Sequence, residues 1–135
     1  MAAPLFVIMS QKSLLILGIL KKKRKEISIM INLNAEQFKK YVQEGSQPVL
    51  VEFWAPWCVY CRRIAPALQK LSDQLGESIV IGQVNIDDEP LLANQERIEV
   101  IPTLILYHNG EAKGSIVAPE SKAKIEEFIK KTLEN

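Results

Sequence analysis

The chain has 135 residues, 47% of them hydrophobic and 24% charged, which suits one soluble globular domain with an extension. Residues 1–29 hold six of the 17 basic residues and one of the 16 acidic ones, which leaves 11 basic and 15 acidic side chains, a net charge of −4, in residues 30–135. This acidic part lacks the basic surface of a nucleic-acid-binding protein, and two cysteines are too few for the disulfide framework of a small secreted domain.

Residues 1–29 form an extension in which an apolar stretch, Leu5–Leu20, precedes the basic run Lys21–Lys25. A secretory signal has its basic residues first, so this order is the reverse of a signal peptide. Three interpretations stay open: a disordered tail or a translation-start artefact, since Met30 opens a self-sufficient domain; a membrane-associated anchor; or another targeting signal. We therefore divide the chain into this extension and a domain spanning residues 30–135.

The first half of the domain predicts a helix, a buried strand and a second helix. Asn34 followed by Gln37 is typical of a capping box, which begins a helix over Ala35–Glu44. Val49–Trp54 is an apolar run broken by one carboxylate, and this pattern indicates a strand buried on both faces of a sheet. Apolar residues at spacings of four, three and four then predict a helix over about Cys58–Leu75.

The second half predicts a strand at Ile79–Ile86, a short helix at Pro90–Arg97 and then a hairpin. Its strands, Thr103–His108 and Ala112–Val117, flank Asn109-Gly110, a strong turn signal. A final helix follows Ser121, and its apolar face consists of Ile125, Phe128, Ile129 and Leu133. The predicted fold class is α/β, with a central mixed sheet of four to five strands and helices on both faces.

The two cysteines, Cys58 and Cys61, lie at the predicted start of a helix that follows a buried strand. Amide N–H groups and the helix dipole favour a thiolate there, which lowers the pKa of Cys58. The three-residue spacing brings both sulfurs close enough to bond when they are oxidised. We expect the first sulfur to be exposed and the second to be sheltered, an arrangement that favours thiol–disulfide exchange.

Two other interpretations of the cysteine pair stay open. Zinc sites share the C-x-x-C spacing, but a structural zinc ion usually takes four protein ligands. Besides the cysteines the chain offers one histidine, His108, which is predicted to lie far away at the end of a strand. The second interpretation is a pair of plain structural thiols, and a disulfide that closes so small a loop constrains the unfolded chain little.

The segment Val51–Cys61 reads V-E-F-W-A-P-W-C-V-Y-C and resembles the active-site segment of the thioredoxin family, usually written W-C-G-P-C. Ile101–Thr103 and the later Asn109-Gly110 look like the family's cis-proline loop and its following hairpin. Asn85–Asp87 also falls at a family-like position. The resemblance covers about residues 30–135 and implies the thioredoxin fold.

The resemblance also implies roles for individual residues. Cys58 attacks the substrate disulfide, and Cys61 resolves the resulting mixed disulfide. A cis peptide bond before Pro102 faces the cysteines, and the backbone of Ile101 pairs with an extended substrate segment. The implied substrate-binding residues are Trp57, Tyr60, Ile101 and Pro102.

Glu52 interrupts the apolar strand six residues before Cys58. Burial of a charged carboxylate is costly, so we expect its pKa to rise. Thioredoxins usually carry Asp at this position as a proton relay to the resolving cysteine, which implies the same acid–base role for Glu52 toward Cys61. The alternative is a buried carboxylate whose hydrogen bonds are satisfied and which takes no part in catalysis.

The chain departs from the family between the cysteines, where Val59-Tyr60 replaces Gly-Pro. This pair tunes the stability of the thiolate and hence the reduction potential. We expect a potential at or above the roughly −270 mV of thioredoxin and below the roughly −120 mV of a strong oxidant.

The resemblance implies a protein-disulfide reductase that binds no cofactor and receives electrons from NADPH through a thioredoxin reductase. Its expected partners are that reductase and disulfide-containing proteins, and we expect a cytoplasmic monomer. Two alternatives stay open: a non-redox binding module built on the same fold, and a disulfide oxidase or isomerase.

Overall fold

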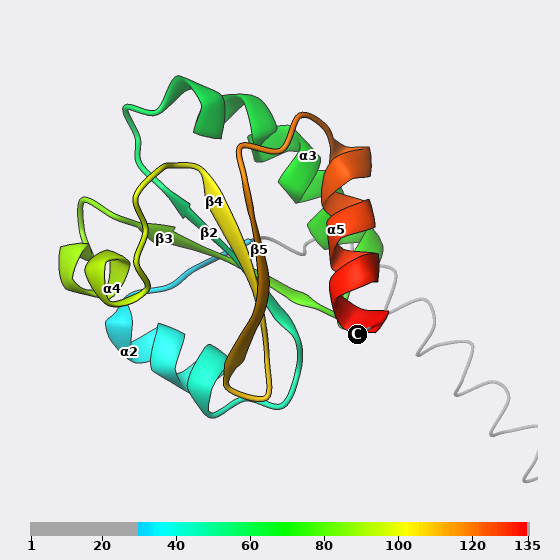
Figure 1. Cartoon of the computed structure of the whole chain (residues 1–135), viewed down its shortest axis with the longest axis horizontal. Helices are drawn as coiled ribbons and strands as arrows, with labels where there is room; N and C mark the ends of the chain where they lie inside the picture. Colours follow the sequence, from blue (N-terminus) through cyan, green and yellow to red (C-terminus); the bar gives the residue numbers. More distant parts are fainter. Residues whose placement is uncertain (1–29, 135) are drawn as a thin grey trace, which may run out of the picture.

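A computed structural model describes residues 30–134, so the predictions for residues 1–29 lie outside the described part of the chain. Five strands form one mixed sheet in the order β1-β3-β2-β4-β5, and helices cover both of its faces (Figure 1). The predicted α/β class and sheet are confirmed. The elements are β1 (Ile31–Asn32), α2 (Ala35–Phe38), η1 (Lys39–Gln43), β2 (Val49–Trp54), α3 (Val59–Leu75), β3 (Val80–Asn85), α4 (Pro90–Gln95), β4 (Thr103–His108), β5 (Glu111–Val117) and α5 (Lys122–Glu134).

The central strand is β2, which pairs with parallel β3 on one side and antiparallel β4 on the other. Its side chains alternate between two apolar clusters, one on each face of the sheet. One cluster joins the sheet to α2, η1 and α4, and it includes Phe38, Val42, Val51, Phe53 and Leu92. The other joins the sheet to α3 and α5, and it includes Leu50, Ile64, Leu68, Ile125 and Ile129.

The sequence prediction missed strand β1. It has only two residues, Ile31 and Asn32, which pair in parallel with Gly82 and Gln83 of β3. A strand this short carries no periodic pattern, and its position depends on the edge that β3 offers. No helix among residues 30–134 has the length and apolar character needed to cross a lipid bilayer.

The first predicted helix exists but changes its hydrogen-bonding pattern along its length. Both bonds of the predicted capping box are present: Asn34 Oδ1 accepts the N–H of Gln37 at 2.8 Å, and Gln37 Oε1 accepts the N–H of Asn34 at 3.1 Å. After one α-helical turn the chain continues as the π-helical segment η1, where the N–H of Glu44 bonds to the carbonyl of Lys39.

The predicted hairpin and the last helix cap are confirmed. Asn109 and Gly110 have φ values of 54° and 80°, the left-handed conformations that a two-residue turn between β4 and β5 requires. Ser121 Oγ accepts the N–H of Lys124 at 3.2 Å and so caps α5.

The strand directions bring the predicted site residues together at one end of the sheet, where β2 and β3 finish. Parallel β2 and β3 end there at Trp54 and Asn85, which lie in register. Antiparallel β4 begins at the same end of the sheet, because its first residue, Thr103, pairs with Phe53. The cysteines follow β2 after the short turn Ala55-Pro56-Trp57, and the Ile101-Pro102 dipeptide precedes β4 directly, so residues far apart in sequence meet at this end of the sheet.

The capping box gives a test of local stability. Replacement of Asn34 by Ala removes the acceptor for the N–H of Gln37, and we expect a loss of about 1 kcal/mol in the free energy of unfolding. Urea titration of the oxidised protein measures this loss. Asn94→Ala, at an exposed position of α4, serves as the control, and equal losses in the two variants would contradict the assigned cap.

Candidate active site

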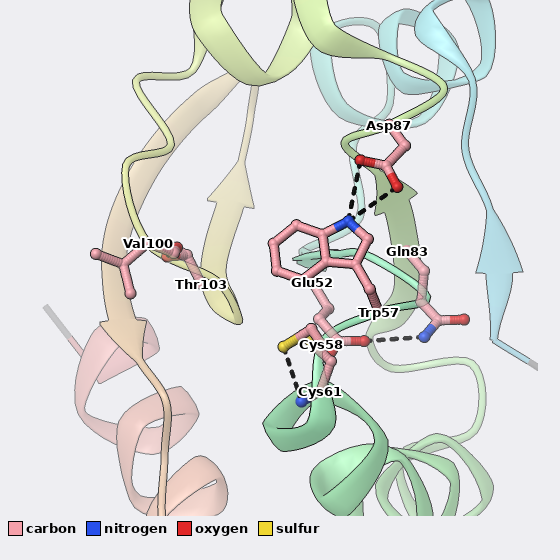
Figure 2. Close-up of a disulfide and its surroundings, with 8 residues drawn as sticks. All are labelled: Glu52, Trp57, Cys58, Cys61, Gln83, Asp87, Val100 and Thr103. Atoms are coloured by element: carbon pink, nitrogen blue, oxygen red, sulfur yellow. Dashed lines mark hydrogen bonds between the residues drawn. A yellow bond between two sulfur atoms is a disulfide. The ribbon is translucent and has the colours of Figure 1, made fainter.

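Cys58 is the N-cap residue of α3, in an extended conformation with φ −83° and ψ 108°. Its sulfur accepts the backbone N–H of Cys61 at 3.2 Å, the place that a serine or aspartate oxygen usually takes at a helix start (Figure 2). Cys58 and Cys61 are joined by a disulfide, with their Cα atoms 5.3 Å apart. The predicted pairing at the helix start is confirmed.

The expected contrast in exposure between the two cysteines is small. Cys58 is 7% exposed and Cys61 is 3% exposed, so both lie below the surface in the oxidised protein. The Cys58 sulfur accepts the Cys61 N–H and is bonded to the Cys61 sulfur. The prediction of an openly exposed first sulfur is therefore wrong for this oxidation state.

Glu52 lies in the layer between the sheet and α3. Leu50, two residues earlier on β2, packs against α3, and side chains two apart on a strand share a face. Glu52 is only 1% exposed. Its Oε1 accepts a hydrogen bond of 2.9 Å from Nε2 of Gln83, while its buried Oε2 has no hydrogen-bond partner among the described residues (Figure 2).

Burial raises the pKa of Glu52 to about 7, and the hydrogen bond from Gln83 partly offsets the rise. The expected direction of the shift is confirmed. A carboxyl group that titrates near neutral pH is able to take up and release a proton under ordinary conditions.

Trp57, one of the predicted substrate-binding residues, lies at the surface. Its side chain is 64% exposed, and its Nε1–H donates to both carboxylate oxygens of Asp87, at 3.1 and 3.3 Å. This bond holds the indole beside Cys58 at the end of β2 (Figure 2). Trp54, by contrast, is half-buried as the last residue of β2.

The peptide bond between Ile101 and Pro102 is cis, as the family resemblance implied. Pro102 is buried and Ile101 is half-buried. Two hydrogen bonds fix this loop: the Thr103 hydroxyl donates to the Val100 carbonyl, and the Ala118 N–H donates to the Pro102 carbonyl at 2.9 Å. The loop therefore holds a fixed position at the same end of the sheet as the cysteines.

Tyr60, the other predicted substrate-binding residue, is held in place by apolar packing and a hydrogen bond. It packs against the cluster beneath α3 and α5, and its hydroxyl donates to the Pro119 carbonyl at 3.4 Å. His108 ends β4 at the turn, the opposite end of that strand from Thr103. Among residues 30–134 no three histidine, cysteine, aspartate or glutamate side chains gather as metal ligands would.

Sequence reasoning missed two residues that shape the site. Gln83 was hidden inside a strand predicted from its apolar neighbours, although a glutamine in such a strand signals a buried partner. Asp87 stood in a family-like segment, but nothing in the sequence linked it to Trp57, thirty positions away.

Comparison of the sequence with known protein families and proteins identifies the family to which the chain belongs. The family model described as "Thioredoxin" matches residues 29–131. The chain belongs to the thioredoxin family. It is 37% identical over 102 residues to the chloroplastic M-type thioredoxin of Spinacia oleracea, which covers 76% of this chain and 56% of that protein. It is 35% identical over 107 residues to thioredoxin 1 of Synechococcus elongatus, covering 79% of this chain and all of that protein. It is 34% identical over 102 residues to the thioredoxin of Rickettsia felis, covering 76% of this chain and 97% of that protein.

Family membership and the joined C-x-x-C cysteines establish the chemical class of this thioredoxin-family protein. It is a thiol–disulfide oxidoreductase, a redox dithiol protein of the protein-disulfide reductase type, and its substrates are disulfide-containing proteins.

The raised pKa of Glu52 predicts how stability depends on pH. Between the ordinary value of 4.5 and about 7, the folded protein holds a proton on Glu52 that the unfolded chain has lost. The free energy of unfolding therefore falls as pH rises through this window, by about 3 kcal/mol in total. Glu52→Gln removes this contribution.

The measurement is urea unfolding of oxidised wild type and Glu52→Gln at several pH values. Relative to wild type, we expect the variant to gain stability steadily from pH 4 to pH 8. The control is Glu120→Gln, which makes the same substitution at an exposed position. A difference between Glu52→Gln and wild type that does not change with pH would contradict the raised pKa of Glu52.

Proposed function

We propose that Cys58 is the nucleophile and Cys61 the resolving cysteine of this reductase. The observation that carries the proposal is the position of the Cys58 sulfur at the N-cap of α3, where it accepts the N–H of Cys61. Negative charge at a helix N-terminus is stabilised by the free N–H groups and by the helix dipole, so the Cys58 thiolate forms readily. Cys61 lies one turn further into the helix and does not occupy the N-cap position.

The proposed reaction balances in two steps. In the first, the Cys58 thiolate attacks one sulfur of the substrate disulfide; that S–S bond breaks, a substrate thiolate leaves, and a mixed disulfide forms. In the second, Cys61 loses its proton and attacks the Cys58 sulfur, which expels the second substrate thiolate. The substrate gains the two electrons of the dithiol, its two thiolates take up protons from solvent, the proton of Cys61 is released, and the protein ends with the Cys58–Cys61 disulfide.

We assign Glu52 as the base in the second step. Two features support this role: its buried position between β2 and α3, and a pKa of about 7 caused by burial. An ionised Glu52 accepts the proton of the Cys61 thiol, and burial makes the carboxylate a stronger base than an exposed glutamate.

The proposed substrate-binding surface surrounds the cysteines. The exposed indole of Trp57 offers an apolar contact held in place by Asp87. The fixed loop of Ile101 and Pro102 offers a backbone edge to which an extended substrate segment adds as a strand. Tyr60 borders this surface from α3.

We further propose that a thioredoxin reductase returns electrons from NADPH to the Cys58–Cys61 disulfide, and that the protein works as a cytoplasmic monomer. The proposal follows from the chemistry: each turnover leaves the protein oxidised, so the cycle needs an external source of two electrons. A reducing compartment suits a dithiol that must stay reduced between turnovers.

Reduction of insulin by dithiothreitol, followed by turbidity, tests the proposed function. We expect wild type to accelerate the reaction and Cys58→Ser to abolish the acceleration, because the nucleophile is lost. Cys61→Ser keeps the nucleophile but not the resolving thiol, so it accumulates mixed disulfides that mass spectrometry detects at Cys58.

The alternatives predict other outcomes. A non-redox binding module leaves the insulin reaction unaccelerated in wild type. An oxidase gives a reduction potential near −120 mV instead of one closer to −270 mV. Absence of trapped substrate in Cys61→Ser would overturn the assignment of Cys58 as nucleophile.

A further inference from the structure

The backbone of Ile101 is unpaired at the end of the sheet that carries the cysteines. Among residues 30–134, neither its N–H nor its carbonyl takes part in a hydrogen bond. The residues that follow it are paired: the Pro102 carbonyl accepts the N–H of Ala118, and Thr103 lies opposite Val117 in the ladder of β4 and β5. An unpaired donor and acceptor next to a strand form a template for an added peptide strand.

The segment before Ile101 continues this template with an apolar and then a charged side chain. Val100 is 55% exposed, and its carbonyl accepts the hydroxyl of Thr103, which fixes the turn into β4 (Figure 2). Glu99 is exposed and forms no ion pair or hydrogen bond within the described part of the chain. Two residues of extended chain span at most about 7 Å, so Glu99 stands close to the Ile101 backbone.

The charged side chains around the cysteines lie on two flanks. On the α3 flank, the exposed pair Arg62-Arg63 follows the cysteines along the helix. On the α4 flank, the carboxylate of Asp87 is occupied by the indole N–H of Trp57. Glu99 is therefore the carboxylate nearest to Ile101 along the chain, and it has no partner in residues 30–134. The α4 flank thus offers a negative charge to an incoming peptide, and the α3 flank offers positive ones.

Side chains that lie opposite each other on paired strands interact directly. Opposite charges in such a pair are favourable, and like charges are unfavourable. A peptide strand that adds to the Ile101 backbone and runs on past Val100 brings one of its side chains opposite Glu99. A lysine or arginine there is attracted by the carboxylate, whereas an acidic side chain is repelled by it.

We propose that Glu99 is a specificity-determining residue that selects substrate segments carrying lysine or arginine on the side of the disulfide that faces the α4 flank. This inference rests on the proposed addition of an extended substrate segment to the Ile101 backbone. Glu99 takes no part in bond making, since the Cys58 thiolate attacks the substrate disulfide as before. The carboxylate acts by favouring the encounters that hold a basic segment in register.

The test uses four symmetrical peptide disulfides. Each peptide has one cysteine and a run of three lysines or three glutamates, placed either directly before or directly after the cysteine. The reduced, full-length protein is mixed with each disulfide, the reaction is stopped with acid, and mass spectrometry measures the oxidised fraction. The result is a rate constant for each peptide and, for each side of the cysteine, a ratio of the lysine rate to the glutamate rate.

On one side of the cysteine, we expect wild type to react about fivefold faster with the lysine peptide than with the glutamate peptide. Glu99→Gln lowers this ratio, and Glu99→Lys reverses it. On the other side, the ratio changes much less. Because each ratio compares two peptides on one variant, a general loss of activity in that variant cancels.

Glu44→Lys is the matched control, because it makes the same change of charge at an exposed position. Glu44 precedes β2, whose six residues span about 20 Å and separate it from the cysteines. At 0.1 M salt, exposed charges are screened over about 10 Å, so this variant keeps the wild-type ratios.

The outcomes separate this inference from the proposed function. If no peptide disulfide oxidises the reduced wild type, the proposed reductase activity itself is wrong. If the peptides do oxidise it, but Glu99→Lys changes the ratios equally on the two sides of the cysteine or no more than Glu44→Lys does, the selective role of Glu99 is overturned and the reductase assignment stands.

Discussion

The sulfur of Cys58 occupies the N-cap position of α3 and accepts the N–H of Cys61 at 3.2 Å. The first N–H groups of a helix have no partner within the helix, so the sulfur meets a concentration of donors and the positive end of the helix dipole. The same turn brings the second sulfur within bonding reach. In the proposed reaction, this one local arrangement supplies both the stabilised Cys58 thiolate and the Cys61 thiol that later attacks the Cys58 sulfur and expels the substrate thiolate.

The rest of the domain holds this helix start in place. Strand β2 is paired on both sides and leads directly into the cysteine segment, and the apolar face of α3 packs on the sheet through Ile64 and Leu68. Within that packed layer Glu52 is the exception, a buried carboxylate whose burial lowers stability near neutral pH. The fold tolerates this cost at the place where we propose that a proton moves, and such costs are typical of functional sites.

Much of this structure could be predicted from sequence, because the decisive signals are local. The apolar run of β2, the Asn109-Gly110 turn and the Asn34 capping box each depend on neighbours in the chain, and each is confirmed. The missed features depend on tertiary pairing instead. Strand β1 exists because β3 offers an edge, and Gln83 reaches Glu52 only through the register of β2 and β3. The burial of Cys58 is likewise a property of the folded domain that the local sequence does not reveal.

The most direct test of this account is the pH dependence of alkylation of Cys58 in the reduced, full-length protein. Iodoacetamide reacts with the thiolate, and mass spectrometry assigns the modified residue, so the rate reports how readily this one sulfur ionises. The account predicts a half-maximal rate well below pH 8.5, the approximate value for an ordinary cysteine, with Cys58 modified before Cys61. A half-maximal rate at about pH 8.5 or above, or earlier modification of Cys61, would contradict it.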